Sequence, residues 1–152
     1  MKLSEKIFER DIDEVEVGIS DIVLATKGEI ESYQLGYQIN GVTGEKIEDW
    51  FGEEFIVIGE DTALGDPIIA KVDEENVPIY WMIHDDWTSL TKIADSFKVF
   101  IQILHLIDDA DLSNETQKEN ILKEILALAD EKAMIYWESL IVNAYEFYNE
   151  EE

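Results

Sequence analysis

The stretch that decides the fold is residues 55–104, FIVIGEDTALGDPIIAKVDEENVPIYWMIHDDWTSLTKIADSFKVFIQIL. It begins with short apolar runs at 55–59, 67–72 and 77–83, which are separated by Gly, Asp and Asn residues that favour turns. Runs of this length between turn residues predict β-strands, and such short connections join antiparallel neighbours. A last short strand is expected at 91–94. The stretch therefore predicts a sheet that is followed directly by a helix.

The end of this stretch has the spacing of an amphipathic helix. Its apolar side chains fall on one helix face: Phe97, Phe100, Ile101, Leu104 and Ile107. Ser96 precedes them and is a suitable N-cap, because its hydroxyl can accept from the free amides of the first turn. We expect this helix to cover the sheet.

The residues before this stretch predict a hairpin. Residues 19–26 and 33–39 alternate and contain the β-branched and aromatic side chains typical of strands, and the Lys-Gly-Glu sequence at 27–29 fits the connection. A short helix is expected at 3–10, and one or two helical turns at 45–51. The whole sheet should contain about five or six strands, antiparallel or mixed.

Glycine and proline divide the chain into two parts. All eight glycines and both prolines lie at or before Pro78. This distribution predicts a sheet-rich part at 15–95 and a helical part at 96–150, with further helices near 116–129 and 131–148. The chain of 152 residues has the length of one compact domain. We expect a single α+β domain with helices packed on a sheet.

The expected 131–148 helix is apolar on more than one side. One stripe contains Met134, Trp137, Ile141, Tyr145 and Tyr148. Other apolar side chains fall away from that stripe, namely Ile135, Leu140, Val142 and Phe147. A helix that is apolar nearly all round is normally buried. The sequence leaves open whether the second side is extra core or a surface for a homodimer or another partner.

The chain is strongly acidic. It has 36 acidic and 11 basic residues, for a net charge of −25. Such a surface repels nucleic acid and anionic membrane and attracts basic partners, although solubility alone also explains it. Arg10 is the only arginine, which counts against enzymes that clamp phosphates.

Cysteine is absent, which excludes disulfides and thiolate chemistry. The N-terminal sequence has no pattern of a secretory leader, and no apolar run approaches the length of a bilayer span. We therefore expect a cytoplasmic protein.

Candidate catalytic groups are few. His84 and His105 are the only histidines. His84 precedes Asp85 and Asp86, a combination that attracts cations, but consecutive residues do not all point inward and no metal-binding spacing completes the set. A polar turn is the simpler interpretation. Phosphate-loop and nucleophile-elbow motifs are also missing. We expect no catalytic residues, no metal and no cofactor.

Three pieces of the 55–104 stretch carry a family resemblance. They are Gly65-Asp66-Pro67-Ile68, the downstream Trp87, and Ile93-Ala94-Asp95-Ser96-Phe97 followed by Phe100 and Leu104. Together they resemble the SUKH superfamily, bacterial proteins related to the Smi/Knr regulators of fungal cell-wall synthesis. The resemblance implies an α+β fold and a non-enzymatic role, most often as an immunity protein that binds and neutralises a polymorphic toxin.

The acidic composition agrees with a basic target such as a nuclease toxin, whose active-site cleft must attract phosphates. Two other readings remain. One is a Smi/Knr-like scaffold or regulatory module that acts on the cell's own cell-wall or signalling proteins. The other is an enzyme built around His84.

Roles are also expected for individual residues, some inside the family motif and some outside it. Four motif residues are expected to be structural: Gly65 in a turn, Asp66 holding that turn, Ser96 at the helix start and Phe97 in the core. The candidate partner contacts are Asp61, Asp85 and Asp86, expected on loops near the sheet. Trp87 is expected either in the core or in the binding face.

Overall fold

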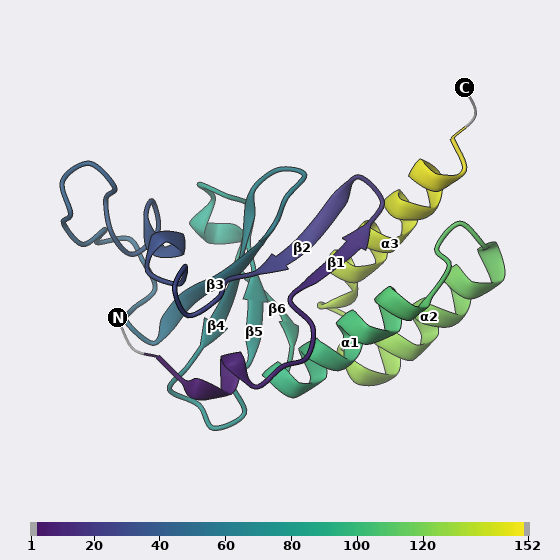
Figure 1. Cartoon of the computed structure of the whole chain (residues 1–152), viewed down its shortest axis with the longest axis horizontal. Coiled ribbons are helices and arrows are strands. Elements are labelled where there is room, and N and C mark those ends of the chain that lie inside the picture. The colour runs from purple at the N-terminus through teal and green to yellow at the C-terminus, as the bar shows by residue number, and fades with distance from the viewer. Residues whose placement is uncertain (1–2, 151–152) are drawn as a thin grey trace.

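The computed structural model describes residues 3–150 and contains one six-stranded antiparallel sheet in which the strands lie in sequence order (Figure 1). The strands are β1 (Glu14–Val17), β2 (Ser20–Leu24), β3 (Phe55–Asp61), β4 (Asp66–Lys71), β5 (Ile79–Trp81) and β6 (Thr91–Ala94). The expected α+β class is confirmed, and the sheet is purely antiparallel.

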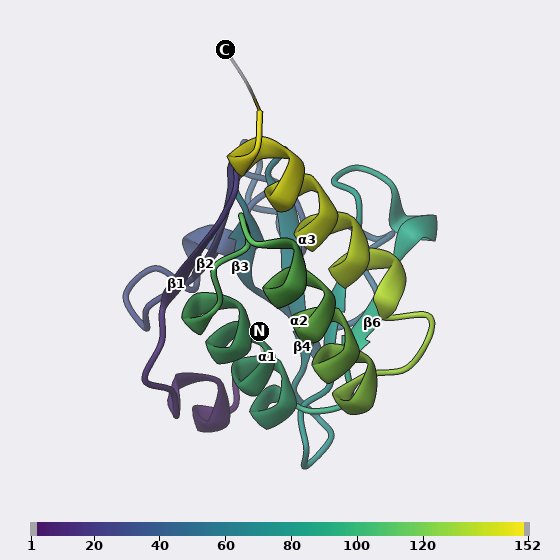
Figure 2. The same cartoon turned by 90° about the vertical axis from the view of Figure 1, so that its right-hand side faces the viewer.

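Three helices follow the sheet and lie on one of its faces (Figure 2). They are α1 (Phe97–Asp109), α2 (Glu115–Leu128) and α3 (Met134–Tyr148), and short 3-10 helices occur at Glu5–Phe8, Ser32–Gln34 and Trp87–Ser89. The Ser96 hydroxyl accepts a hydrogen bond from the Val99 amide at 3.0 Å, and Asn114 caps α2 in the same way. Each cap fixes where its helix begins.

The apolar face of α1 forms the centre of the core. Phe97, Phe100, Leu104 and Ile107 are buried there. Ile101 is half-buried at the edge of that face, and Ile103 is buried in its place. The prediction of the helix and of its sheet-facing side is therefore confirmed. The buried side includes Ile103 where the prediction had Ile101.

Helix α3 is buried on one side only. Trp137 is fully buried, and its indole N–H donates to the carbonyl of Ile93 in β6 at 2.8 Å. On the opposite side, Ile135 is 72% exposed, and near the C-terminal end of the helix Phe147 is 44% exposed. One side of this helix thus supplies core. A homodimer through its other side stays a prediction.

The expected hairpin of 19–26 with 33–39 is wrong. β2 pairs with β1 through the turn at Gly18, and 33–39 forms a 3-10 turn and irregular chain. The alternation at 33–39 arises because Gln34 and Gln38 point toward the sheet. Gln34 bonds both the amide and the carbonyl of Val57, at 2.9 and 2.7 Å. β2 pairs with β3 only at residues 59–61, so the backbone of Val57 has no strand partner on that side. The Gln34 side chain makes those hydrogen bonds instead.

The helical turns expected at 45–51 are also wrong. This segment forms non-helical turns instead. Glycines at 44 and 52, both with positive φ, flank it and break a helical path. The segment lies against the face of the sheet that the three helices leave open.

A β-bulge in β3 determines which way the end of that strand faces. The register with β4 shifts between Val57 and Gly59. Because an extra residue inverts the alternation of side chains, Asp61 turns to the helix-covered side, although simple alternation from Ile56 and Ile58 would place it on the other.

Candidate functional site

The face of the sheet away from the helices has its own small apolar layer. Val57, Ile69 and Met82 are buried there, and aromatic side chains pack around them. Figure 1 shows the covering segment, in blue, on the side of the sheet opposite the helices. We call the following half-buried rings the aromatic patch: Tyr37, Trp50, Phe51, Phe55, Tyr80 and Trp87.

Trp50 is the hub of the aromatic patch. Its ring centroid lies 5.2 Å from that of Phe51, 5.6 Å from that of Trp87 and 6.0 Å from that of Tyr37. The rings meet in tilted or edge-on arrangements, which aromatic pairs favour. The indole N–H of Trp50 donates to the Phe55 carbonyl at 2.9 Å, which fixes the ring to β3. The patch is therefore an ordered surface that still contacts solvent.

Acidic residues are the sequence neighbours of both tryptophans in the aromatic patch. Glu48 and Asp49 precede Trp50, and Asp85 and Asp86 precede Trp87. The only base in the 44–54 segment is Lys46, which pairs with Glu53 at 2.9 Å. Two acidic residues thus directly precede each tryptophan of the patch.

Tyr37 of the aromatic patch and its neighbour Tyr33 have raised pKa values. Burial raises the pKa of Tyr37, and the carboxylates of Asp85, Asp66 and Glu60 raise it further. Burial followed by the charges of Glu60 and Glu29 raises the pKa of Tyr33. Both hydroxyls therefore keep their protons at neutral pH and can donate hydrogen bonds.

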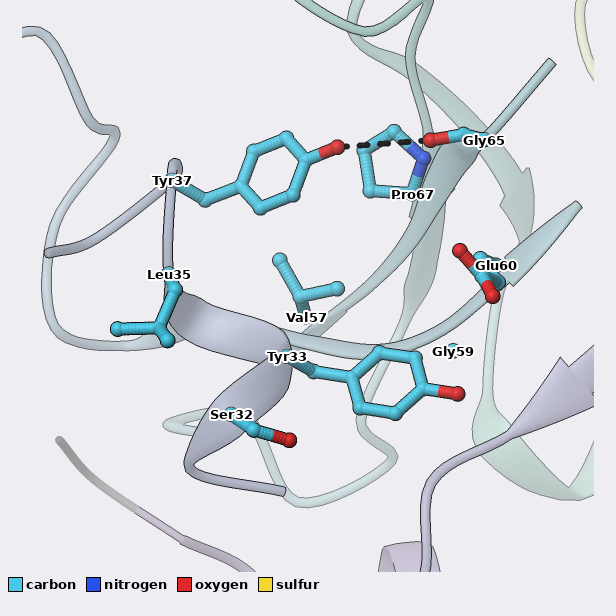
Figure 3. A pocket seen from close by; sticks show the side chains of 9 residues that line it. All are labelled: Ser32, Tyr33, Leu35, Tyr37, Val57, Gly59, Glu60, Gly65 and Pro67. Atoms are coloured by element: carbon cyan, nitrogen blue, oxygen red, sulfur yellow. Dashed lines mark hydrogen bonds between the residues drawn. The ribbon is translucent and has the colours of Figure 1, made fainter. Parts of the chain in front are cut away.

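A pocket of about 350 Å³ opens beside the patch (Figure 3). Its lining comes from the 3-10 segment and from β3 and β4: Ser32, Tyr33, Leu35, Tyr37, Val57, Gly59, Glu60, Gly65 and Pro67. Figure 3 shows the two phenol rings reaching across Val57 toward Glu60 and Gly65. With one carboxylate and three hydroxyls over an apolar floor, this pocket can accept hydrogen bonds from a bound side chain and also donate to it.

Three of the candidate contact residues lie together beside the aromatic patch. Asp85 is exposed and has a φ of 64°, which is uncommon for a residue with a side chain. Asp86 caps the 3-10 helix, and its Oδ1 accepts from the amide and hydroxyl of Thr88 at 3.1 and 2.6 Å. Trp87 belongs to the patch itself, so it is half core and half surface.

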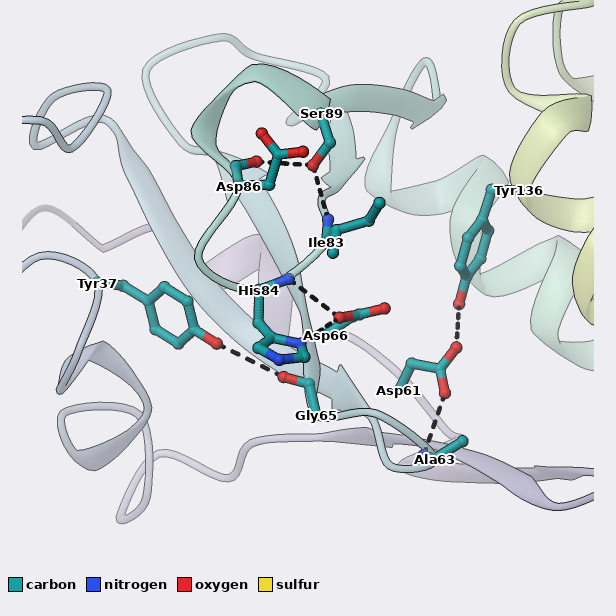
Figure 4. Close-up of polar contacts among 10 residues, drawn as sticks. All are labelled: Tyr37, Asp61, Ala63, Gly65, Asp66, Ile83, His84, Asp86, Ser89 and Tyr136. Atoms are coloured by element: carbon teal, nitrogen blue, oxygen red, sulfur yellow. Dashed lines mark hydrogen bonds and ion pairs between the residues drawn. The ribbon is translucent and has the colours of Figure 1, made fainter.

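Asp61 does not lie on a loop, and that expected placement is corrected. It is the last residue of β3, is 9% exposed and accepts a hydrogen bond from the Tyr136 hydroxyl at 3.3 Å (Figure 4). The β-bulge explains this position. Asp61 is therefore on the opposite side of the sheet from Asp85 and Trp87.

The four motif residues occupy fixed places in the fold. Gly65 has a φ of 74° in the turn before β4, Ser96 caps α1 and Phe97 is 5% exposed. Asp66 Oδ1 accepts from the amide of His84 at 3.0 Å and lies 2.8 Å from its Nδ1. Asp66 thus holds the chain that leaves β5, and not its own turn as expected.

The structure brings the His84 ring to the Asp66 carboxylate. Among residues 3–150, no group of three or more His, Asp or Glu side chains is placed to hold a metal ion. In the same part of the chain, no helix is long and apolar enough to cross a bilayer.

Tyr136 gives a testable pH dependence. Burial, followed by the charges of Asp61 and Asp66, raises its pKa well above the ordinary value. The unfolded chain loses this proton near pH 10, whereas the native protein keeps it, so stability is fully present below pH 10 and falls above it. Above about pH 10 the free energy of unfolding should fall with pH in both proteins. We expect the slope to be about 1.4 kcal/mol per pH unit smaller in Tyr136→Phe than in the wild type.

Urea unfolding at a series of alkaline pH values measures both slopes. Identical slopes for the two proteins would contradict this assignment. Below about pH 9 the curves for the two proteins should run parallel, because neither state of the tyrosine is ionised there.

The chain matches no protein-family model, no curated protein and no solved structure. The function proposed below therefore rests on the family resemblance of the sequence and on the geometry of the aromatic patch.

Proposed function

We propose that this chain is a non-enzymatic binding protein of the SUKH type, an immunity protein that neutralises a bacterial toxin by binding it directly. The observation that carries the proposal is the aromatic patch, whose half-exposed rings are bordered by carboxylates on the face of the sheet that the helices leave open. The motif resemblance supplies the class of partner.

The patch has the properties of a protein-binding surface. Tryptophan and tyrosine are enriched among the residues that dominate binding energy, especially when they sit at the centre of a surface and are packed into fixed positions. Trp50 and Trp87 meet both conditions, since their centroids are 5.6 Å apart and further rings surround them. These two side chains are the proposed anchors.

The charge indicates the chemistry of the partner. A net charge of −25 accelerates encounter with a basic protein and slows encounter with acidic ones. A nuclease toxin fits, because its cleft must attract phosphates. The carboxylates of Asp49 and Asp85 would then occupy that basic cleft while the tryptophans pack against its rim.

The test is binding to a candidate toxin domain, taken as the C-terminal domain of the protein encoded by the gene next to this one. Association is measured by biolayer interferometry at about 50 mM and about 500 mM salt, conditions that strongly change the screening length. We expect the association rate to fall with salt. We further expect Asp49→Asn/Asp85→Asn to lower it severalfold at low salt, because charges at the rim of an interface act mainly on association.

The matched control is Asp108→Asn/Asp109→Asn, which removes the same charge from exposed positions of α1. It should change the association rate only slightly. Absence of binding at low salt, or an equal effect of the two double variants, would reject the proposed face.

A further inference from the structure

A second cleft lies on the other side of the sheet, between the β3–β4 turn and α3. It measures about 360 Å³, and we call it the α3 cleft. Its mouth is apolar, because Ile19, Leu64 and Ile135 line it and are 73%, 71% and 72% exposed. Its interior is polar, with Asp61, Asp66, Trp81 and Tyr136. The cleft therefore has exposed apolar side chains at its mouth and two buried acids in its interior.

The two acids of the cleft face each other across a pair of strands. Asp61 and Asp66 are directly opposite in the β3–β4 register and are 9% and 4% exposed. Among residues 3–150, neither carboxylate forms an ion pair with a lysine or arginine. Like charges placed opposite each other destabilise a sheet, and buried carboxylates normally have a partner of opposite charge.

The hydrogen bonds within the cleft leave acceptor capacity unused. Within the described part of the chain, the Asp61 carboxylate accepts hydrogen bonds only from the Tyr136 hydroxyl at 3.3 Å and the Ala63 amide at 3.4 Å, and both bonds are long. Both contacts of Asp66 with His84 use Oδ1. Its Oδ2 accepts no hydrogen bond from the described residues, and Figure 4 shows that oxygen directed toward Asp61 and Tyr136. The interior therefore has acceptor capacity for a ligand with several donors.

Trp81 places a buried hydrogen-bond donor in the lining of the cleft. Its Nε1 is buried and, among residues 3–150, has no hydrogen-bond partner. Natural proteins rarely leave such a group unsatisfied. Its ring lies against that of Tyr136, with centroids 5.0 Å apart and an angle of 38° between the planes. The cleft thus offers an aromatic surface next to the two acids.

We propose that the α3 cleft binds an arginine side chain presented by a protein partner. The guanidinium is planar and carries five donors, which can serve Asp61 and Asp66 together, and it stacks on aromatic rings. The aliphatic stem packs along Ile19, Leu64 and Ile135. A guanidinium has no acceptor, so the N–H of Trp81 is completed by a main-chain carbonyl of the partner or by a water molecule that enters with it.

Lysine fits this cleft less well. Its ammonium is a compact, strongly hydrated charge that neither bridges two carboxylates in a plane nor stacks on a ring as guanidinium does. The α3 cleft also lies across the sheet from the aromatic patch. The inference therefore does not depend on the proposed toxin-binding face, and either can fail without the other.

Nuclear magnetic resonance of the ¹⁵N-labelled full chain tests this site. The chain has four tryptophans, and Trp81→Phe assigns the indole resonance of Trp81. We expect titration with Nα-acetyl-arginine methylamide to shift that resonance saturably. The indole of Trp137, which is bonded to Ile93, should stay in place. Nα-acetyl-citrulline methylamide, a neutral molecule of nearly the same shape, should bind at least about tenfold more weakly.

Variants provide the second arm of the test. Asp61→Asn/Asp66→Asn should weaken binding of the arginine probe about tenfold or more, whereas the control Asp108→Asn/Asp109→Asn should not. Equal affinity for the citrulline or the corresponding lysine probe, or full affinity in the Asn variant, would overturn the proposal. Shifts confined to Trp50 and Trp87 would also overturn it. If the Asn variant fails to fold, the comparison of probes on the native chain still decides.

Discussion

Gly59→Ala is expected to lower the free energy of unfolding by about 3 kcal/mol. A Cβ at this position would lie 2.4 Å from the carbonyl oxygen of Val23 and 2.9 Å from Cδ2 of Leu24. The nearer atom belongs to the backbone of β2, so it cannot move aside without disturbing the pairing of β2 with β3. Urea unfolding monitored by tryptophan fluorescence measures the loss.

The matched control is Gly28→Ala. The nearest heavy atom to a Cβ at Gly28 is the Thr26 hydroxyl oxygen at 3.9 Å, which is ordinary contact. We expect a change within about 0.5 kcal/mol, or slight stabilisation from a stiffer unfolded chain. A Gly59→Ala protein as stable as the wild type would contradict the close packing of β2 on β3.

Gly59 also links the fold to the α3 cleft. It lies at the register shift that turns Asp61 toward the helices. Without that bulge, Asp61 and Asp66 would not share one side of the sheet, and the cleft would lose one of its two acids. The same local irregularity thus determines both the close approach of two strands and the chemistry of the cleft.

The sheet and its covering helix could be predicted because their signals are local. The apolar runs of 55–104 are bounded by turn residues, and Ser96 starts a stripe at helical spacing. The N-terminal hairpin could not be predicted, because polar side chains imitate a strand pattern there. Gln34 and Gln38 are buried and bond the edge of β3, whereas Leu35 is 50% exposed.

The aromatic patch was predictable only in part. Trp87 was singled out, but Trp50 and Phe51 lie in a segment without periodicity and come to the same face only through the fold. One signal was present, because Glu48-Asp49-Trp50 and Asp85-Asp86-Trp87 both read as two acids followed by tryptophan. The position of Asp61 had one signal in the sequence, because an isolated glycine inside a strand, here Gly59, often marks a bulge. Simple alternation along the strand ignores that bulge and places Asp61 on the wrong side of the sheet.

Trp50→Ala/Trp87→Ala is expected to weaken binding of the toxin domain about 1,000-fold. Anchor residues of this kind contribute about 2 kcal/mol or more each, and a factor of ten corresponds to about 1.4 kcal/mol. Because the two rings are in contact, their effects are not independent, and a double-mutant cycle should show coupling. Isothermal titration calorimetry with the purified toxin domain measures the loss.

Two controls separate lost contact from lost structure. Phe147→Ala removes an aromatic side chain that is 44% exposed on α3, far in sequence from the patch, and should leave binding within about twofold. Trp87→Phe keeps a ring against Trp50 and should recover much of the affinity. Trp50 also packs on Phe51, so thermal unfolding of every variant must accompany the titrations. A folded double variant that binds as tightly as the wild type would move the interface away from the aromatic patch, whereas weakening confined to the two tryptophans would place the anchors there.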